Sequence, residues 1–186
     1  MDLSVETLTS PDPETLRDVA VLEIVAWGRT PELAEVAART ERLAREIGQL
    51  DPAAKGIFVA RDSGAVVGVG RVMRNGDDPA EWMVYALAVH PERRRQGIGR
   101  ALLDARIAFA RSHGARTIRS ETHADNRISI AYHEAVGFVN EGPFTAPDGD
   151  AKIAFLMPLA GQPCARMLGA LPSCLELPPC SRAVKS

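Results

Sequence analysis

The stretch VHPERRRQGIGR, residues 89–100, joins a predicted strand to a predicted helix through a basic turn that contains two glycines. Residues 80–89 are almost all apolar, which is typical of a strand inside a sheet. Residues 97–113 carry apolar side chains at helical spacing. Glycines let a backbone approach an anion closely, and the free N–H groups of a helix's first turn favour negative charge. The turn is therefore suited to a pyrophosphate, with its arginines adding positive charge.

Other phosphate-binding turns do not fit this stretch. A Walker loop needs Gly-Lys-Ser/Thr, whereas Gly99 is followed by arginine and alanine. A dinucleotide fingerprint needs a third glycine where Leu102 stands. The second glycine pair, at residues 68–70, has Met73 in that place and lies among apolar residues, which predicts a strand interior or a bulge. A solvated turn that caps a helix is the alternative explanation of the arginines.

The rest of the chain contains further predicted strands and helices on both sides of this turn. Two strands surround a turn at residues 62–64, within the segment 56–73. Further strands are predicted at 3–9, 80–89, 115–121, 138–144 and 151–157, and helices at 13–27, 31–47, 97–113 and 127–135. The order is strand, two helices, three strands, helix, strand, helix, two strands. It predicts an α/β (α+β) fold of three layers around a central mixed, twisted sheet of about seven strands.

Residues 1–159 are predicted to form this one domain, and residues 160–186 a flexible C-terminal tail. The tail holds many prolines and all three cysteines, whose odd number and spacing match no zinc or redox motif. We therefore expect no metal.

Composition narrows the function class. The chain has 186 residues, 46% of them hydrophobic and 25% charged, with a formal net charge of −2. This balance is ordinary for a globular protein and argues against a broad nucleic-acid interface. No apolar run reaches the length of a membrane span, and the acidic N-terminus has no apolar signal segment. We expect a cytoplasmic protein without a membrane or nucleic-acid partner.

Two blocks resemble the GNAT superfamily of acyl-CoA N-acyltransferases. Residues 94–99, RRQGIG, are similar to its motif A, Gln/Arg-x-x-Gly-x-Gly/Ala, and residues 89–92 to its V-x-P-x. Residues 126–138, NRISIAYHEAVGF, look like the family's N-x-x-[SA]-x-x-[LY]-[YH]-x-x-x-G-F block, and like its phosphinothricin-type acetyltransferase branch. The resemblance covers about residues 3–158 and is strongest over 81–139.

This resemblance implies acetyl-CoA, or a related acyl-CoA, as cosubstrate, without a metal or a covalent enzyme intermediate. It implies that backbone groups of Leu87 and Val89 pair with the pantetheine arm, and that the Val89 N–H stabilises the oxyanion. Asn126 would start a helix as its N-cap and also contact the pantetheine. The pyrophosphate would be held by Arg94, Arg95, Gln96, Gly97, Ile98, Gly99 and Arg100. The amine would enter where the strands 82–89 and 115–121 splay apart.

Acyl transfer to an amine requires a general base, because the ammonium must lose a proton before attack. Glu121, at the end of the strand 115–121, is the favoured base. Glu81, at the start of the other strand, competes with it, and the loop residue His123 is a third candidate. Solvated charges at strand ends and in loops are the alternative explanation of all three.

The departing thiolate benefits from a general acid, and the sequence departs from the family here. Many members place tyrosine four residues before the glycine of Gly-Phe, where this chain has His133. A histidine near its ordinary pKa can protonate a thiolate as imidazolium. A packing histidine, with thiolate release to solvent, is the alternative. Tyr132 points about 100° away around the helix, so we expect it in the core or against the cofactor.

The favoured function is an N-acetyltransferase that moves an acetyl group to a primary amine of a small molecule. A protein Nα- or lysine-acetyltransferase and a non-catalytic acyl-CoA-binding module stay as alternatives. The acceptor is not readable from the sequence. Trp27 and Trp82 could line its pocket or belong to the core, and Arg29 could contact it. A homodimer, common in the family, is left open.

Overall fold

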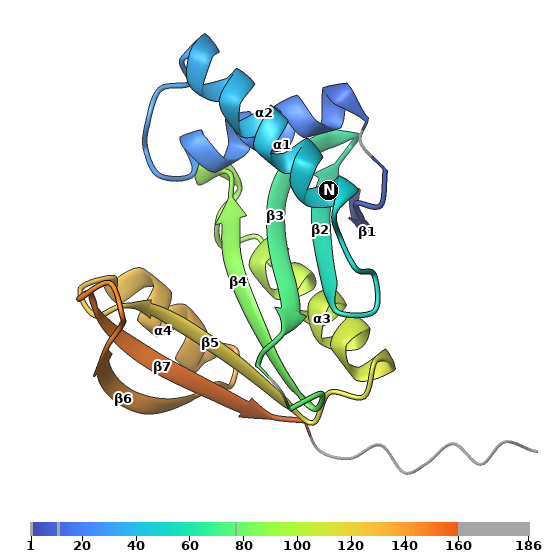
Figure 1. The fold of residues 1–186 in the computed structure, drawn as a ribbon. Coiled ribbons are helices and arrows are strands. Elements are labelled where there is room, and N and C mark those ends of the chain that lie inside the picture. The colour runs from blue at the N-terminus through green and yellow to red at the C-terminus, as the bar shows by residue number, and fades with distance from the viewer. Residues whose placement is uncertain (1, 11, 77, 160–186) are drawn as a thin grey trace, which may run out of the picture.

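The fold is built on a seven-stranded sheet with the order β1-β2-β3-β4-β5-β7-β6 (Figure 1). The computed structural model describes residues 2–10, 12–76 and 78–159, so the predicted tail lies outside the described residues. The strands are β1 (Leu3–Thr7), β2 (Lys55–Asp62), β3 (Ala65–Arg74), β4 (Glu81–Val89), β5 (Thr117–His123), β6 (Val139–Thr145) and β7 (Ala151–Pro158). The helices are α1 (Pro13–Val25), α2 (Leu33–Gly48), α3 (Ile98–Ser112) and α4 (Arg127–Ala135). The predicted fold class and element order are confirmed.

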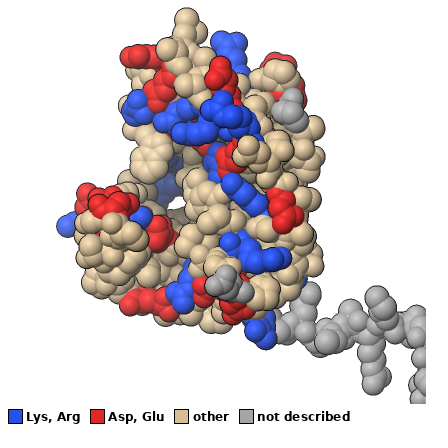
Figure 2. Space-filling model, viewed as in Figure 1, with Lys and Arg blue, Asp and Glu red and all other residues tan. Residues whose placement is uncertain are grey.

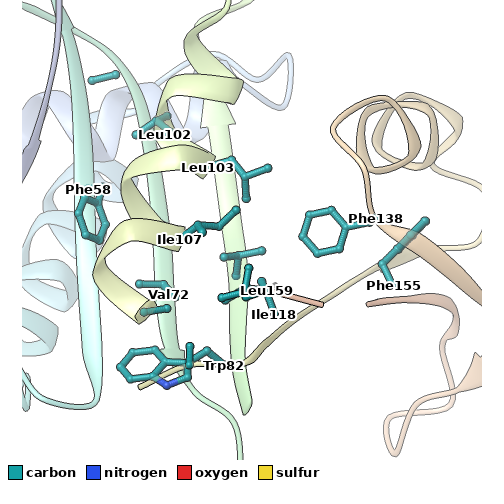
Figure 3. Close-up of a cluster of buried hydrophobic side chains, with 14 of the residues drawn as sticks. Phe58, Val72, Trp82, Leu102, Leu103, Ile107, Ile118, Phe138, Phe155 and Leu159 are labelled. Atoms are coloured by element: carbon teal, nitrogen blue, oxygen red, sulfur yellow. The ribbon is translucent and has the colours of Figure 1, made fainter. Parts of the chain in front are cut away.

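The two faces of the sheet carry separate apolar cores because alternate strand residues point to opposite sides. In β2, Ile57 and Val59 pack with α1 and α2, whereas Phe58 and Ala60 pack with α3. Figure 3 shows Leu102, Leu103 and Ile107 of α3 lying against the sheet. The sheet is thus the middle one of three layers, as predicted.

The central parallel pair, β4 and β5, is joined over only a short distance. Its register comprises Glu81↔Thr117, Trp82↔Ile118 and Met83↔Arg119, and beyond these residues the strands separate. The strands β5, β7 and β6 continue with α4 as a smaller unit, which we call the wing (Figure 1). The predicted splaying of these two strands therefore begins after Met83 and Arg119. We call the space beyond this point the opening.

A bulge reshapes β4 alongside the opening. The register with β3 shifts between Val69↔Ala88 and Arg71↔Tyr85, so β4 contains an extra residue there. Ala86 has a φ of 50°, in the left-handed region that is rare for a side chain other than glycine. Opposite the bulge lies Gly70, where an added Cβ would approach the Arg106 guanidinium carbon to 3.0 Å. Of the two predicted possibilities for residues 68–70, a strand interior or a bulge, the first is found, because they lie inside β3 and the extra residue is on β4.

Helix boundaries agree with the predicted ones to within a few residues. The helix predicted to reach residue 27 ends at Val25, because the chain then turns through Gly28, whose φ is 72°. Asp12 caps α1 by accepting a hydrogen bond from the Thr15 N–H at 3.0 Å. In the described ranges, no helix is both long and apolar enough to cross a membrane.

Candidate active site

The basic turn after β4 exposes its backbone. Residues Pro91–Arg93 form a single 3-10 turn, and α3 starts at Ile98. Between them, Arg95 has a φ of 61° and Gly97 a φ of 84°. Successive residues in left-handed and right-handed conformations turn their N–H groups toward one side and form a concavity suited to an anion. The local geometry that the sequence predicted for this turn is therefore present.

The amides from Arg95 to Arg100, in the second part of this turn, have no acceptors among the described residues. The first helical hydrogen bond runs from the Ala101 N–H to the Gly97 carbonyl at 2.9 Å. Gly97 occupies the N-cap and has no side chain with which to cap α3. Six consecutive N–H groups are therefore available to a ligand: Arg95, Gln96, Gly97, Ile98, Gly99 and Arg100.

The polar side chains of the turn bind to the protein itself. Arg93 forms an ion pair with buried Asp62 at 3.0 Å. Arg94 donates to the Val89 carbonyl at 3.3 Å and also to the Ala26 carbonyl at the end of α1. These contacts hold the turn against β4 and α1. Arg100 pairs with Asp104 one helical turn later, and the Gln96 amide donates to the Glu92 carbonyl.

Tyr132 connects α4 to the start of α3. Its hydroxyl donates to the Gly99 carbonyl at 2.8 Å. An added Cβ at Gly99 would lie 3.3 Å from a ring carbon of Tyr132, so glycine gives this contact room. Tyr132 is half-buried at this contact and is not part of the buried core, and the expectation that it lies against the cofactor stays a prediction. Asn126 caps α4, since its side-chain oxygen accepts from the Ser129 N–H at 3.1 Å.

His133 lies within the wing, next to the point where the strands separate. Its Nε2 lies 2.7 Å from the hydroxyl of Ser120 on β5, and that hydroxyl lies 3.2 Å from the Val84 carbonyl on β4. The imidazole stacks on Phe155 with ring centres 4.5 Å apart and meets the edge of Phe138. These two phenylalanines are visible in the wing in Figure 3. The residue is only 7% exposed.

The hydrogen bonds of His133 determine which of its ring nitrogens carries a proton. Nδ1 lies 2.7 Å from the Ser129 carbonyl, which can only accept, so Nδ1 carries a hydrogen. Burial lowers the pKa of the imidazole below its ordinary value, which favours the neutral ring. Neutral His133 then accepts at Nε2 from the Ser120 hydroxyl. If Nε2 is protonated instead, Ser120 can turn its proton to the Val84 carbonyl.

The candidate bases lie at different places along the opening. Glu121 is on β5 beyond the last pair with β4, is 36% exposed and pairs with Lys152 of β7 at 2.8 Å. Glu81 is at the closed end, where its carboxylate binds Arg119 at 2.7 Å and Asn75 at 2.6 Å. His123 lies 3.7 Å from Asp150. Of these two candidate carboxylates, Glu121 lies beside the opening and Glu81 lies at its closed end.

A cavity of about 320 Å³ lies between α1, α2 and the bulge of β4. Residues 85–88 form one wall, and the exposed Trp27 forms part of the rim. The other walls carry a charged cluster composed of Glu23, Arg39, Arg42, Glu46 and Arg71. Trp82, the other tryptophan that could have lined a pocket, is fully buried in the core.

The sequence interpretation did not identify this charged cluster. Arg71 is the residue that could have identified it, since it stands in an otherwise apolar strand and a buried arginine needs partners. Its partners come from two helices: Glu23 of α1 at 2.6 Å and Glu46 of α2 at 3.3 Å. Arg29 pairs with Glu35 at 2.8 Å instead of lining the cavity.

Comparison with known proteins identifies the family. Residues 20–138 match the acetyltransferase (GNAT) family. The chain belongs to this family. Among solved structures, this GNAT chain is similar to a putative GNAT acetyltransferase from Desulfovibrio desulfuricans, with a TM-score of 0.70 and 21% identity over 84% of this chain and 98% of the other. The PaiA N-acetyltransferase from Thermoplasma acidophilum, solved in complex with coenzyme A, gives a TM-score of 0.65 and 18% identity over 83% and 98%.

Curated relatives resemble the GNAT chain over shorter segments. A mycothiol acetyltransferase from Geodermatophilus obscurus is 32% identical over 125 residues, which is 61% of this chain and 40% of the relative. The matched part covers between 21% and 40% of the length of the first five relatives. The resemblance to GNAT proteins stated from the two sequence blocks is thus confirmed, whereas nothing singles out the phosphinothricin-type branch.

Proposed function

We propose that this GNAT protein transfers an acetyl group from acetyl-CoA to the primary amine of a small molecule. The observation that carries the proposal is the set of free amides from Arg95 to Arg100 at the start of α3. A diphosphate needs several donors on one side and a positive local field, and a helix start preceded by a concave turn supplies both. The residues present therefore fit the diphosphate of coenzyme A.

The open edge of β4 fits the rest of the cosubstrate. Leu87 and Val89 lie beyond Met83, the last residue of β4 that pairs with β5, so this edge has no strand partner within the part of the chain that the structure describes. Main-chain groups on such an edge can pair with the amides of a pantetheine arm. Bound there, acetyl-CoA supplies an acetyl group activated as a thioester. In this proposal the Val89 N–H is the donor for the developing oxyanion.

Glu121 is the proposed general base. It lies beside the opening and is partly exposed, so a water molecule can connect its carboxylate to an incoming ammonium. Lys152 donates a hydrogen bond to this carboxylate at 2.8 Å and holds it in place. Glu81 is the weaker candidate, because it is committed to Arg119 and Asn75 at the closed end.

In our proposal, His133 acts as the general acid through a second residue. His133 does not need to reach the thiolate itself, since the Ser120 hydroxyl lies between Nε2 and the edge of β4. Ser120 can donate a proton toward the opening and be reprotonated from Nε2 whenever His133 is charged. Because the pKa of His133 is lowered from its ordinary value, the charged ring is the minor form already at neutral pH, and this route gives way there to thiolate release to solvent.

The size of the cavity favours a small acceptor over a protein segment. About 320 Å³ beside the β4 bulge lies at the lower end of the range of small-molecule sites. A protein Nα- or lysine-acetyltransferase needs room for a peptide on both sides of the reacting amine. A binding module without catalysis is the remaining alternative, and only an assay separates it from an enzyme.

The test combines binding with turnover. Calorimetry should detect coenzyme A binding, and a panel of amines with acetyl-CoA should release free thiol in an amine-dependent way. Glu121→Gln should lower the rate by about 100-fold near neutral pH and recover as the pH approaches the amine's own pKa, whereas Glu81→Gln should keep most of the rate. Binding without turnover on any amine would favour the binding module, and an absence of binding would overturn the assignment of the turn.

A further inference from the structure

The charged cluster in the cavity has an excess of positive charge. Its three guanidinium groups, Arg39, Arg42 and Arg71, face two carboxylates, Glu23 and Glu46. Lys55 adds another cation, because its ammonium binds Glu46 at 2.7 Å. An acceptor that enters the cavity therefore meets a site that already contains more cations than anions.

Both carboxylates are committed to these cations. Glu23 binds Arg71 at 2.6 Å and lies 3.5 Å from Arg39. Glu46 is shared between Lys55 and Arg71. Burial raises the pKa of Glu46, but the hydrogen bond from Lys55 and the charge of Arg71 outweigh it and leave the pKa below its ordinary value. Neither carboxylate is available to a second ammonium without breaking a pair in which Arg71 is buried.

Of the three arginines in the cluster, Arg42 makes the longest ion pair and is the most exposed. Its closest carboxylate is Glu23 at 3.8 Å, and its side chain is 63% exposed. Arg39, by contrast, binds Glu35 at 3.0 Å and also approaches Glu23. An arginine fork that lines a cavity and makes only one long ion pair can accept a carboxylate in a bidentate arrangement.

The wing, on the other side of the opening from this cavity, carries negative charge. Figure 2 shows Lys and Arg side chains gathered where α1 and α2 lie in Figure 1, and Asp and Glu side chains at the end of the wing. In the wing, Glu121 binds Lys152 of β7 at 2.8 Å, and the charges of Asp148 and Asp150, in the turn before β7, also raise the pKa of Lys152, so three carboxylates surround one ammonium. A ligand between the two sides meets positive charge on one and negative charge on the other.

Building on the proposed function, we infer that the acceptor is a small zwitterion, a primary amine that also carries a carboxylate, with the carboxylate bound by Arg42. The ammonium then faces the wing, where Glu121 takes its proton. The exposed indole of Trp27 on the rim gives the acceptor's apolar part a surface to pack on. Polycationic amines are excluded, since they would bring further positive charge next to Arg39, Arg42 and Arg71.

The test uses three acceptors that differ only at the carboxylate: phenylalanine, phenylalaninamide and phenethylamine. The amide also represents a protein N-terminus, which has no free α-carboxylate. With the full chain and acetyl-CoA, kcat/KM should be at least about tenfold higher for phenylalanine than for the other two, the size of one charged hydrogen bond. A panel of other apolar α-amino acids with their amides extends the comparison.

Arg42→Gln should remove this preference by lowering kcat/KM for phenylalanine to the level of the two acceptors without a carboxylate. Arg45→Gln is the matched control, because Arg45 lies on the same helix, is 65% exposed and pairs with Glu41 outside the cavity. Amides or plain amines that equal the acids, or a preference that persists in Arg42→Gln, overturn the inference but not the acetyltransferase.

If no amine is turned over, calorimetry of the enzyme–coenzyme A complex with each acid decides the outcome. Heat of coenzyme A binding without any binding of the acids overturns the inference alone. An absence of coenzyme A binding shows that the proposed function itself has failed.

Discussion

The starts of α3 and α4 differ in how they treat their backbone amides. At α4, the Asn126 side chain accepts a hydrogen bond from the Ser129 N–H, as Asp12 does for Thr15 at α1. At α3, the N-cap is Gly97, and the amides around it are left without acceptors in the described part of the chain. A cap stabilises a helix by satisfying its first amides, so an uncapped start loses this stabilisation and keeps its donors for another molecule.

An uncapped start alone does not mark a binding site, since Glu32 at the start of α2 also makes no side-chain cap hydrogen bond. In our proposal, the concave turn before α3 is what makes its open amides a site for an anion. Gly97 is suited to this in two ways, since its φ of 84° is accessible to glycine and no atom lies within 4 Å of the place of a Cβ. An anion can approach the backbone there without meeting a side chain. An aspartate at the N-cap of α3, the residue type that caps α1, tests whether the open amides are needed for binding.

Gly97→Asp should produce the largest effect. A carboxylate at this N-cap competes for the free amides and repels a diphosphate, and we expect coenzyme A affinity to fall about 100-fold, the loss of roughly one or two charged hydrogen bonds. Stability should change little, because an acid at a helix start is favourable and offsets the strain of the positive φ. Calorimetry and thermal melting measure the two quantities.

Gly114→Asp is the control for that substitution. Gly114 follows the other end of α3, has a φ of 88° and is equally open around its Cβ position. The backbone strain is similar, but the carboxylate stands at the negative end of the helix dipole, so stability should fall while coenzyme A binding persists. Equal affinity losses in both variants would mean that helix distortion, and not the turn's amides, controls binding.

Asn126→Ala should have a smaller effect that falls on stability. Loss of an N-cap side chain costs about 1 kcal/mol, which urea denaturation can resolve. Asn126→Asp keeps an acceptor for the Ser129 N–H and should retain the stability. If Asn126 also contacts the pantetheine, as the family resemblance implies, the alanine variant will in addition raise KM for acetyl-CoA, whereas a cap alone leaves KM unchanged.

Asp12 should give the smallest effect, visible only in acid. The hydrogen bonds from Thr15 lower the pKa of the Asp12 carboxyl below its ordinary value of 3.8. A depressed pKa means that the stabilisation is fully present above the unfolded-state value and is lost as the pH falls through the folded-state value. In Asp12→Asn this part of the acid dependence should disappear. Urea midpoints between about pH 5 and about pH 2.5 compare the two proteins, and parallel curves would contradict the assignment.

The parts of the fold that depend on local patterns were predictable from the sequence. The two apolar segments around the turn at residues 62–64, the apolar run in residues 80–89 and the capping residue Asp12 each act over a few neighbours, and the observed elements follow them. The turn at residues 94–100 was predictable for the same reason, since its glycines and its flanking strand and helix are contiguous in the chain.

The acceptor side was not predictable, because its residues come from separate elements. Glu23, Arg42 and Arg71 belong to α1, α2 and β3, and only the packing of both helices on the sheet brings them together. The environment of His133 shows the same limit: its position in the motif is clear from the sequence, but its contacts with Ser120 and Phe155 depend on how α4 packs on the wing.

The short pairing of β4 with β5 has a mechanical consequence. Because the ladder between the two halves of the sheet ends at Met83 and Arg119, few backbone hydrogen bonds set the angle between them. Side chains carry part of that task, because the Glu81 carboxylate of β4 binds Arg119 of β5 at 2.7 Å and the Ser120 hydroxyl of β5 lies 3.2 Å from the Val84 carbonyl of β4. If both substrates enter through the opening, as we propose, these few contacts between the two halves set the width of the entrance.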